Sequence, residues 1–285
     1  MPEDDVPDPD VPGAGTSRSA LLVALARTHL TWMGVIDDPC ARELLPGTLR
    51  WRLAVAALRL PGLGALGRSP TFAYLAGRTC FFDDVVADSL DRGIDQVVVL
   101  GAGYDSRSWR FARPGVTFFE VDRPATQSAK RARAPAGGPV YVAADVTDPS
   151  LADRLCGAGF RRGRPTVFTA EGLTMYLTGD QVARLLCTLA GLGGPGSRLA
   201  VNFGVGFERR DSGRGRLGRR VMERGGEEFR FRLDLADAPE FVTGAGWATE
   251  RTCTGPQLRD TYLAGTRLAA VEVTSSGCAV EAAIP

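Results

Sequence analysis

The spacing of apolar and polar positions changes about a third of the way along the chain. Before residue 92, apolar residues recur at helical spacing, so this part is predicted to be α-rich. The expected helices are Ser19–His29, Cys40–Leu45, Leu49–Leu60 and Thr71–Asp91. From Gln96 onward, short apolar runs typical of buried strands replace the helical pattern.

The second part of the chain alternates these apolar runs with helical or glycine-rich links. The expected strands are Gln96–Gly101, Val116–Val121, Val140–Ala144, Thr166–Ala170, Ser197–Phe203, Ala248–Cys253 and Leu268–Thr274. This alternation favours an α/β fold: a doubly wound, mostly parallel sheet with helices on both faces and an α-helical N-terminal extension. The sequence contains no internal repeat.

Two segments interrupt this pattern. Residues 1–18 are acidic and proline-rich, with neither the basic flank nor the apolar core of a signal peptide, and are expected to form a disordered tail. Residues 206–232 mix many arginines with acidic residues and glycines, as in a solvated insertion or a mobile lid. We therefore expect a helical cap over residues 19–92 and an α/β domain over residues 93–285 that carries this insertion.

The composition is that of an ordinary globular protein. Of 285 residues, 44% are hydrophobic and 24% are charged, and the net charge of +1 argues against a nucleic-acid partner. The apolar run 53–66 is too short and too interrupted to span a membrane. Six scattered cysteines are typical of reduced, mostly buried thiols in the cytoplasm. A single histidine, His29, argues against a histidine-built metal site, so no metal is expected.

The candidate chemistry begins where the first predicted strand ends. Gly101 and Gly103 form a tight turn in which the lack of side chains lets the backbone approach a ligand. About twenty residues later a second strand ends at Asp122, the spacing of the acid that holds a ribose diol in α/β nucleotide sites. The alternative role of Asp122 is to cap the following helix. The pattern points to a cofactor that contains adenosine.

The residue at the third glycine position distinguishes between two cofactors that contain adenosine, NAD and S-adenosylmethionine. A dinucleotide site reads Gly-x-Gly-x-x-Gly, and its helix N-terminus binds the pyrophosphate. Here the third position is Ser106. S-Adenosylmethionine has no phosphate groups and does not need that helix end, so the turn favours S-adenosylmethionine over NAD.

Four segments in this order resemble the leucine carboxyl methyltransferase family, and most closely its bacterial branch of polyketide-type O-methyltransferases. They are Leu100–Arg107, Phe119–Asp122, Ala144–Val146 and Thr169–Leu177. The resemblance covers the chain from Ser19 to Trp247. It implies the class I methyltransferase sheet and S-adenosyl-L-methionine as the cofactor.

The resemblance also implies roles for single residues in binding this cofactor. Asp145 would accept a hydrogen bond from the adenine amine, and the backbone N–H of Val146 would donate one to the ring. Glu171 would bind the ammonium group of the cofactor, and Arg78 would bind its carboxylate through a bidentate pair. The alternatives are a plain turn at Asp145 and a helix cap at Glu171. No catalytic residue is assigned.

Other residues near these motifs are interpreted as structural. Glu120 lies two residues before Asp122, on the same strand face but deeper. Arg107 is expected to form an ion pair rather than to bind the acceptor. Five residues of the helical cap either line the acceptor site or belong to a plain core: Trp51, Leu53, Val55, Phe72 and Tyr74.

The acceptor class follows from the lack of an evident base, because His29 lies far in sequence from the strand ends. A phenol or alcohol gains ~10²–10⁴-fold from general-base catalysis, whereas a carboxylic acid with a pKa of about 4 is already ionised at neutral pH. The chain therefore favours the carboxylate of a small organic acid or polyketide-like metabolite. The alternatives are a protein C-terminal carboxyl methyltransferase, an NAD-dependent oxidoreductase and a non-catalytic cofactor-binding module. The oligomeric state stays open.

Overall fold

The computed structural model describes residues 17–49, 69–204, 228–231, 233, 235–273 and 277–285. Several predicted features lie outside these residues. They are the tail over residues 1–16, the helix over residues 50–60 with Trp51, Leu53 and Val55, and most of the charged insertion.

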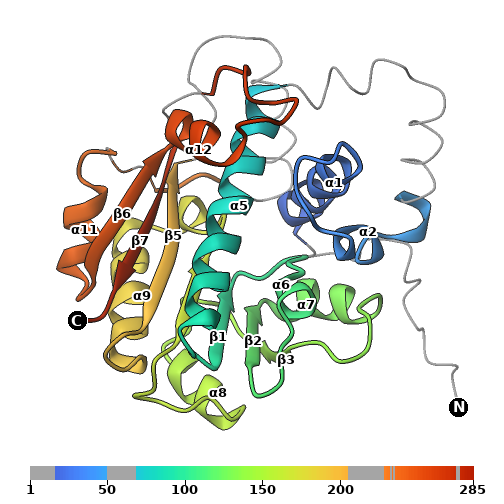
Figure 1. The fold of residues 1–285 in the computed structure, drawn as a ribbon. Helices are drawn as coiled ribbons and strands as arrows, with labels where there is room; N and C mark the ends of the chain where they lie inside the picture. The colour runs from blue at the N-terminus through green and yellow to red at the C-terminus, as the bar shows by residue number, and fades with distance from the viewer. Residues whose placement is uncertain (1–16, 50–68, 205–227, 232, 234, 274–276) are drawn as a thin grey trace, which may run out of the picture.

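The described strands form one seven-stranded sheet with the order β3-β2-β1-β4-β5-β7-β6 (Figure 1). They are β1 (Gln96–Leu100), β2 (Thr117–Asp122), β3 (Val140–Ala143), β4 (Val167–Ala170), β5 (Arg198–Gly204), β6 (Ala248–Thr254) and β7 (Gly277–Ala283). The first five strands pair in parallel, and β7 runs antiparallel to both β5 and β6. The predicted doubly wound, mostly parallel sheet is confirmed.

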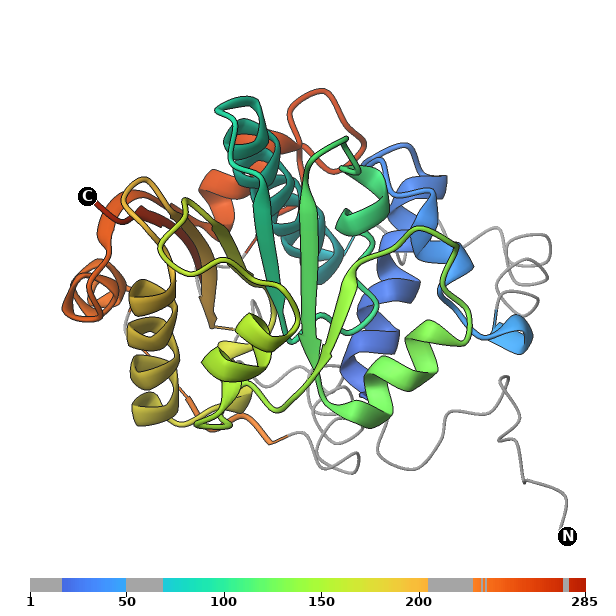
Figure 2. The same ribbon diagram turned by 90° about the horizontal axis from the view of Figure 1, so that it is seen from below.

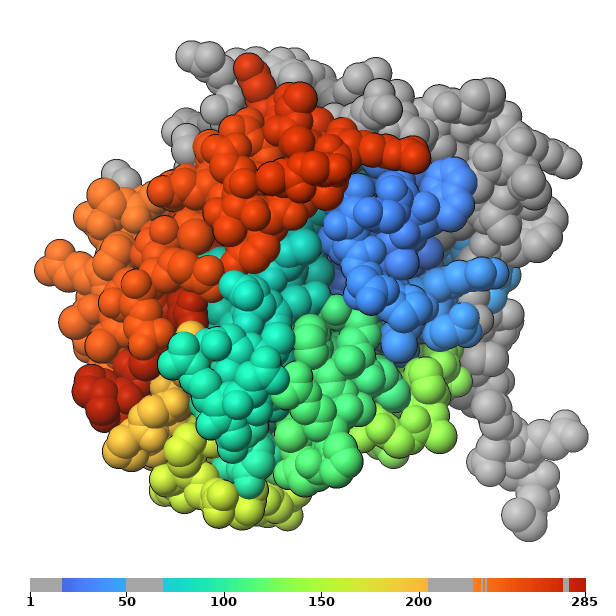
Figure 3. All heavy atoms as spheres, in the orientation of Figure 1, coloured from blue at the N-terminus to red at the C-terminus, as the bar shows by residue number. Residues whose placement is uncertain are grey.

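Helices cover both faces of this sheet, with the teal α5 on one side and the gold α9 on the other in Figure 2. The helices are α1 (Arg18–Trp32), α2 (Cys40–Glu43), α5 (Pro70–Asp91), α6 (Arg107–Arg110), α7 (Pro124–Arg131), α8 (Leu151–Gly157), η1 (Thr174–Tyr176), α9 (Gly179–Leu192), α11 (Ala238–Gly244) and α12 (Gly255–Tyr262). The helix α1 contacts both α5 and α2, and in Figure 3 the blue N-terminal residues lie against the teal α5.

The strand β1 shows why the sheet is covered on both sides. All of its residues are buried, and Val98 and Leu100 belong to the core under α8 and α9. Val97 and Val99 point to the other face and pack with the end of α5. A continuous apolar run is typical of a parallel strand between two helical layers, which explains the strength of the sequence signal.

The helix α1 begins slightly earlier than predicted. Ser17 caps it by accepting a hydrogen bond from the backbone N–H of Ala20, and the backbone N–H of Ser17 donates to Thr126 of α7. Ser17 and Arg18, which the sequence assigned to the tail, therefore belong to the start of α1.

The prediction of a strand over Leu268–Thr274 was wrong. Residues 268–273 contain no strand; they form turns in which the backbone N–H of Val271 donates to the carbonyl of Leu268. Leu268 and Val273 are nevertheless buried in the core around α5 and α12, so their apolar character serves packing and not strand pairing. The last strand lies later, at β7.

The expectation of mostly buried cysteines was also wrong. All six cysteines are free thiols, but only Cys253 and Cys278 are buried, whereas Cys156 and Cys187 are exposed. In the part of the chain that the structure describes, no helix is both long and apolar enough to cross a membrane.

Candidate functional site

The predicted cofactor residues meet at one edge of the sheet. Gly101 follows β1, Asp122 ends β2, Asp145 lies just beyond β3, and Glu171 follows β4. These four strands are parallel neighbours, so their carboxyl ends lie together. The strand order reverses between β1 and β4, which is where ligands bind in open α/β sheets.

Asp122 holds the glycine turn in place. Its Oδ2 accepts a hydrogen bond from the backbone N–H of Gly103 at 2.5 Å, and its Oδ1 accepts one from the N–H of Arg123 at 2.6 Å. Burial raises the pKa of Asp122 above its usual value, although both N–H groups oppose this shift. Each oxygen keeps a second lone pair that could accept from a diol hydroxyl.

Both turn glycines adopt positive φ angles, 59° at Gly101 and 50° at Gly103. The structure also shows a reason for them that differs from the predicted one. A Cβ atom on Gly101 would lie 2.8 Å from Leu173, and one on Gly103 would lie 2.8 Å from Cβ of Ala20 in α1. The lack of side chains therefore lets other parts of the protein pack against the turn.

Glu171 lies between two arginines. Its Oε1 is 2.9 Å from Nε of Arg78 in α5, and its Oε2 is 2.7 Å from Nη2 of Arg107 in α6. Burial raises the pKa of Glu171, but the charges of Arg107, Arg78 and Arg27 outweigh burial and lower it to about 2. The carboxylate is thus ionised throughout the neutral range and suits a cationic ligand.

Arg78 has capacity for a further partner. Among the described residues, only Glu171 accepts a hydrogen bond from its guanidinium, and it does so at Nε. Nη1 and Nη2 instead face the bare side of Gly172, where a Cβ atom would lie 3.6 and 3.5 Å from them. Asn202 holds this glycine by accepting a hydrogen bond from its N–H at 2.6 Å. The N–H groups of Nη1 and Nη2, which form the free fork of this guanidinium, could therefore donate to the cofactor carboxylate that was predicted as the partner of Arg78.

Asp145 forms the turn that was considered as its alternative role. Its Oδ1 accepts from the backbone N–H of Thr147 at 2.9 Å and from the Thr147 hydroxyl at 2.7 Å. Asp145 is exposed, and its Oδ2 has no partner among the described residues, whereas Val146 is buried. The turn therefore leaves one oxygen available to an adenine amine.

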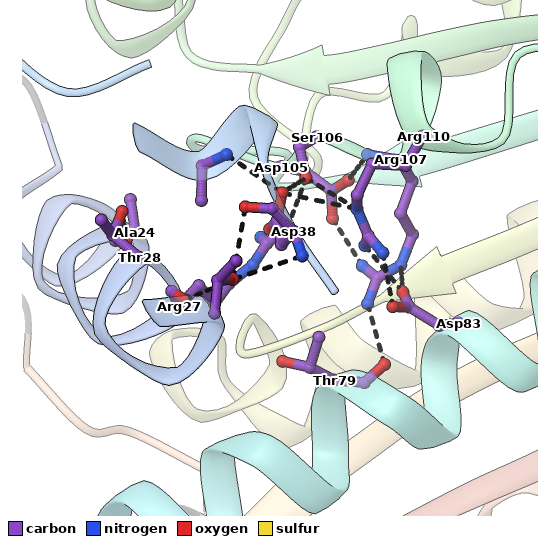
Figure 4. A network of polar contacts seen from close by, with 12 residues as sticks. Ala24, Arg27, Thr28, Asp38, Thr79, Asp83, Asp105, Ser106, Arg107 and Arg110 are labelled. Atoms are coloured by element: carbon purple, nitrogen blue, oxygen red, sulfur yellow. Dashed lines mark hydrogen bonds and ion pairs between the residues drawn. The ribbon is translucent and has the colours of Figure 1, made fainter. Parts of the chain in front are cut away.

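A buried polar network joins the N-terminal helices to the glycine turn (Figure 4). At its centre the Ser106 hydroxyl donates to Oδ1 of Asp38 at 2.7 Å and accepts from Nη2 of Arg27 at 2.6 Å. It also accepts from Nε of Arg110 at 3.0 Å, and Arg27 forms an ion pair with Asp38. A glycine at position 106 could not form these bonds.

Sequence reasoning missed this network. It predicted that Ser106, with Asp105 and Arg107, stabilises the loop after the glycine turn, but it did not single out Arg27, Asp83 or Arg110 as partners. The one usable signal was Asp38, whose position before a short helix predicts a cap. Its Oδ1 does accept from the backbone N–H of Ala41 at 3.0 Å.

Glu120 is structural, as its position on β2 predicted. Its Oε2 lies 2.5 Å from Nζ of Lys130 in α7, and both side chains are 1% exposed. The hydroxyl of Ser108 donates to Oε1 at 3.2 Å, and Nζ lies 5.3 Å from the centre of the Trp109 ring. The pair anchors α7 to β2 next to Asp122.

The remaining candidates are aromatic. His29 is partly buried on α1, with its ring 5.7 Å from those of both Trp32 and Phe72. Tyr74 is fully buried in the core shared by α5 and α12. The structure therefore favours a packing role for Tyr74, while Phe72 stays partly exposed.

Comparison with known proteins shows the family of this chain. A family model described as leucine carboxyl methyltransferase matches residues 17–190. A Mycobacterium avium protein, described as a proposed S-adenosyl-L-methionine-dependent methyltransferase, is 32% identical over 281 residues, covering 90% of this chain and 89% of that protein. A Parafrankia protein of the same description is 44% identical over 152 residues, but that match spans only 51% of this chain and 48% of that protein.

Solved structures share the fold at low sequence identity. A DUF574 family protein from Streptomyces avermitilis superposes with a TM-score of 0.59 at 18% identity, covering 95% of this chain and 99% of that one. A proposed methyltransferase from Thermobifida fusca superposes with a TM-score of 0.55 at 17% identity, covering 91% and 94%.

Proposed function

The chain belongs to the leucine carboxyl methyltransferase family, and on that premise we propose that it methylates a carboxylate oxygen of a small organic acid or polyketide-like metabolite. It is an S-adenosyl-L-methionine-dependent methyltransferase with a class I fold, which removes the NAD-dependent oxidoreductase from consideration. The free thiols are compatible with the cytoplasmic location that we also propose.

The observation that carries the methyltransferase part of this proposal, the binding of the cofactor, is the charge arrangement at the end of β4. The amino-acid tail of the cofactor has an ammonium group and a carboxylate, and Glu171 and the free fork of Arg78 match these charges. Asp122 would accept from the ribose hydroxyls, and Oδ2 of Asp145 from the adenine amine. When bound, the cofactor supplies an electrophilic methyl group, so the protein contributes mainly alignment.

The acceptor class rests on which side chains could remove a proton. Glu120 has a pKa raised to about 7 by burial, with Lys130 opposing the shift, but at 1% exposure it faces Lys130 and no acceptor. His29 of α1 packs between the rings of Trp32, on the same helix, and Phe72 of α5. A carboxylate acceptor is already ionised at neutral pH and needs neither group.

We expect methyl transfer to show a flat rate from about pH 6 to about pH 9 and the new methyl group to be released by mild alkali as methanol. His29→Ala should keep turnover within a few-fold of wild type. The measurement uses cofactor with a radiolabelled methyl group and a panel of aromatic and aliphatic carboxylic acids, phenols and peptides with a free C-terminus.

A different result would reject the carboxylate and leave the methyltransferase assignment intact. An alkali-stable ether product, together with a ~10²–10⁴-fold loss in His29→Ala, would mean a hydroxyl acceptor and a general base. Labelling of a peptide C-terminus, but of no small acid, would favour the protein carboxyl methyltransferase instead.

A further inference from the structure

We infer, on the basis of the proposed function, that Arg107 is a positioning residue that fixes the Glu171 carboxylate for the ammonium group of the cofactor. Arg107 is 0% exposed, so it cannot reach the ligand itself. It acts through Glu171, which it contacts directly.

One guanidinium joins three elements that each carry a predicted cofactor residue. Nε of Arg107 lies 2.7 Å from Asp83 of α5, the helix that carries Arg78. Nη1 lies 2.5 Å from Asp105, which follows the glycine turn. Nη2 lies 2.7 Å from Glu171 at the end of β4. The planar fork of arginine allows these contacts at once, and the single ammonium of lysine does not.

The contact between Arg107 and Glu171 affects the protonation of Glu171, because several charged groups surround this carboxylate. Arg107, Arg78 and Arg27 face the carboxylate as cations, and Asp105 faces it as an anion. Burial alone would raise the pKa of Glu171, and Arg107 is the largest of the charges that lower it. Removing Arg107 therefore raises this pKa, and any Glu171 that becomes protonated loses its attraction for an ammonium group.

The test compares Arg107→Met with Arg198→Met. Arg198 is a second buried arginine, and it joins α5 to β7 through ion pairs with Asp88 and Glu281. Two probes are titrated near pH 8 and near pH 5.5. They are S-adenosylhomocysteine, which has the amino-acid tail, and methylthioadenosine, which lacks it. Thermal unfolding is followed in parallel.

We expect Arg107→Met to weaken the binding of S-adenosylhomocysteine about tenfold or more, because hydrogen bonds to charged groups are among the stronger ones. The loss should grow towards the lower pH, as Glu171 takes up a proton, and methylthioadenosine should be little affected. Arg107→Lys should give an intermediate loss. Arg198→Met should lower the unfolding temperature without a change in either affinity.

Two outcomes would overturn the inference. Equal weakening of both probes in Arg107→Met, or equal behaviour of Arg107→Met and Arg198→Met, would mean that Arg107 only supports the fold. If Arg107→Met does not fold, Arg107→Lys is compared with Arg198→Lys in the same way. Failure of the wild-type protein to bind S-adenosylhomocysteine would instead contradict the proposed cofactor site.

Discussion

Glu171→Gln is expected to weaken S-adenosylhomocysteine binding by roughly ten- to a hundredfold, because a hydrogen bond to a charged group contributes about 1.5–3 kcal/mol. Glutamine keeps the size of the side chain but loses the negative charge that both Arg78 and Arg107 contact. Arg78→Ala should give a loss of similar size, since it removes the partner of the ligand carboxylate. Isothermal titration measures both effects.

The matched control is Glu281→Gln. Glu281 is also a buried carboxylate between two arginines, Arg198 and Arg251, but it lies in β7 away from the candidate site. It should leave cofactor affinity unchanged. Unchanged affinity in Glu171→Gln, with the protein folded, would mean that the ammonium group binds elsewhere.

At about pH 9, above the pKa of Glu120, Lys130→Met is expected to cost about 3–5 kcal/mol of unfolding free energy, because it leaves the buried Glu120 carboxylate without its cation. The double variant Lys130→Met with Glu120→Met should recover much of this loss, since no buried charge remains. Urea denaturation measures the difference. Arg113→Met is the control: its ion pair with Asp91 is exposed, so the loss should stay below about 1 kcal/mol.

The pH dependence of this pair has a defined sign. Glu120 has a pKa of about 7 in the folded protein, above its ordinary value of 4.5, because burial disfavours its charge more than Lys130 favours it. Its contribution to stability is therefore present near pH 4.5 and is lost as the pH rises to about 7. Glu120→Gln should remove this slope. A cost of Lys130→Met that did not shrink on acidification would contradict a buried, titrating Glu120.

The strands that could be predicted from the sequence are those in which an apolar run ends in a candidate cofactor-binding residue. β1 and β2 combine β-branched or aromatic residues with a glycine turn and an acid at their ends. The last strand was not predictable, because β7 consists mainly of small residues with Glu281 in its interior. That charge is tolerated because Arg198 of β5 and Arg251 of β6 pair with it from either side. Such pairing is visible only once the strand order is known.

The site residues at the strand ends could be predicted from the sequence, but the side-chain contacts that join different helices and strands could not. Asp122, Asp145 and Glu171 each follow a recognisable strand, so topology alone brings them to one edge. The partners of Glu171 are different, because arginines are abundant in this chain and no local pattern marks Arg107 as the one in contact. The Ser106–Asp38 bond likewise joins residues 68 positions apart.

The burial of Lys130 has a consequence for amine chemistry. It is the only lysine of the chain, and it is 1% exposed. Acylating reagents need a solvent-accessible amine, and the burial of Lys130 against Glu120 denies them this access. Apart from the terminal amino group, the folded protein therefore presents no primary amine to such reagents. Acylation of this one side chain would report, residue-specifically and without an introduced probe, how often α7 separates from β2.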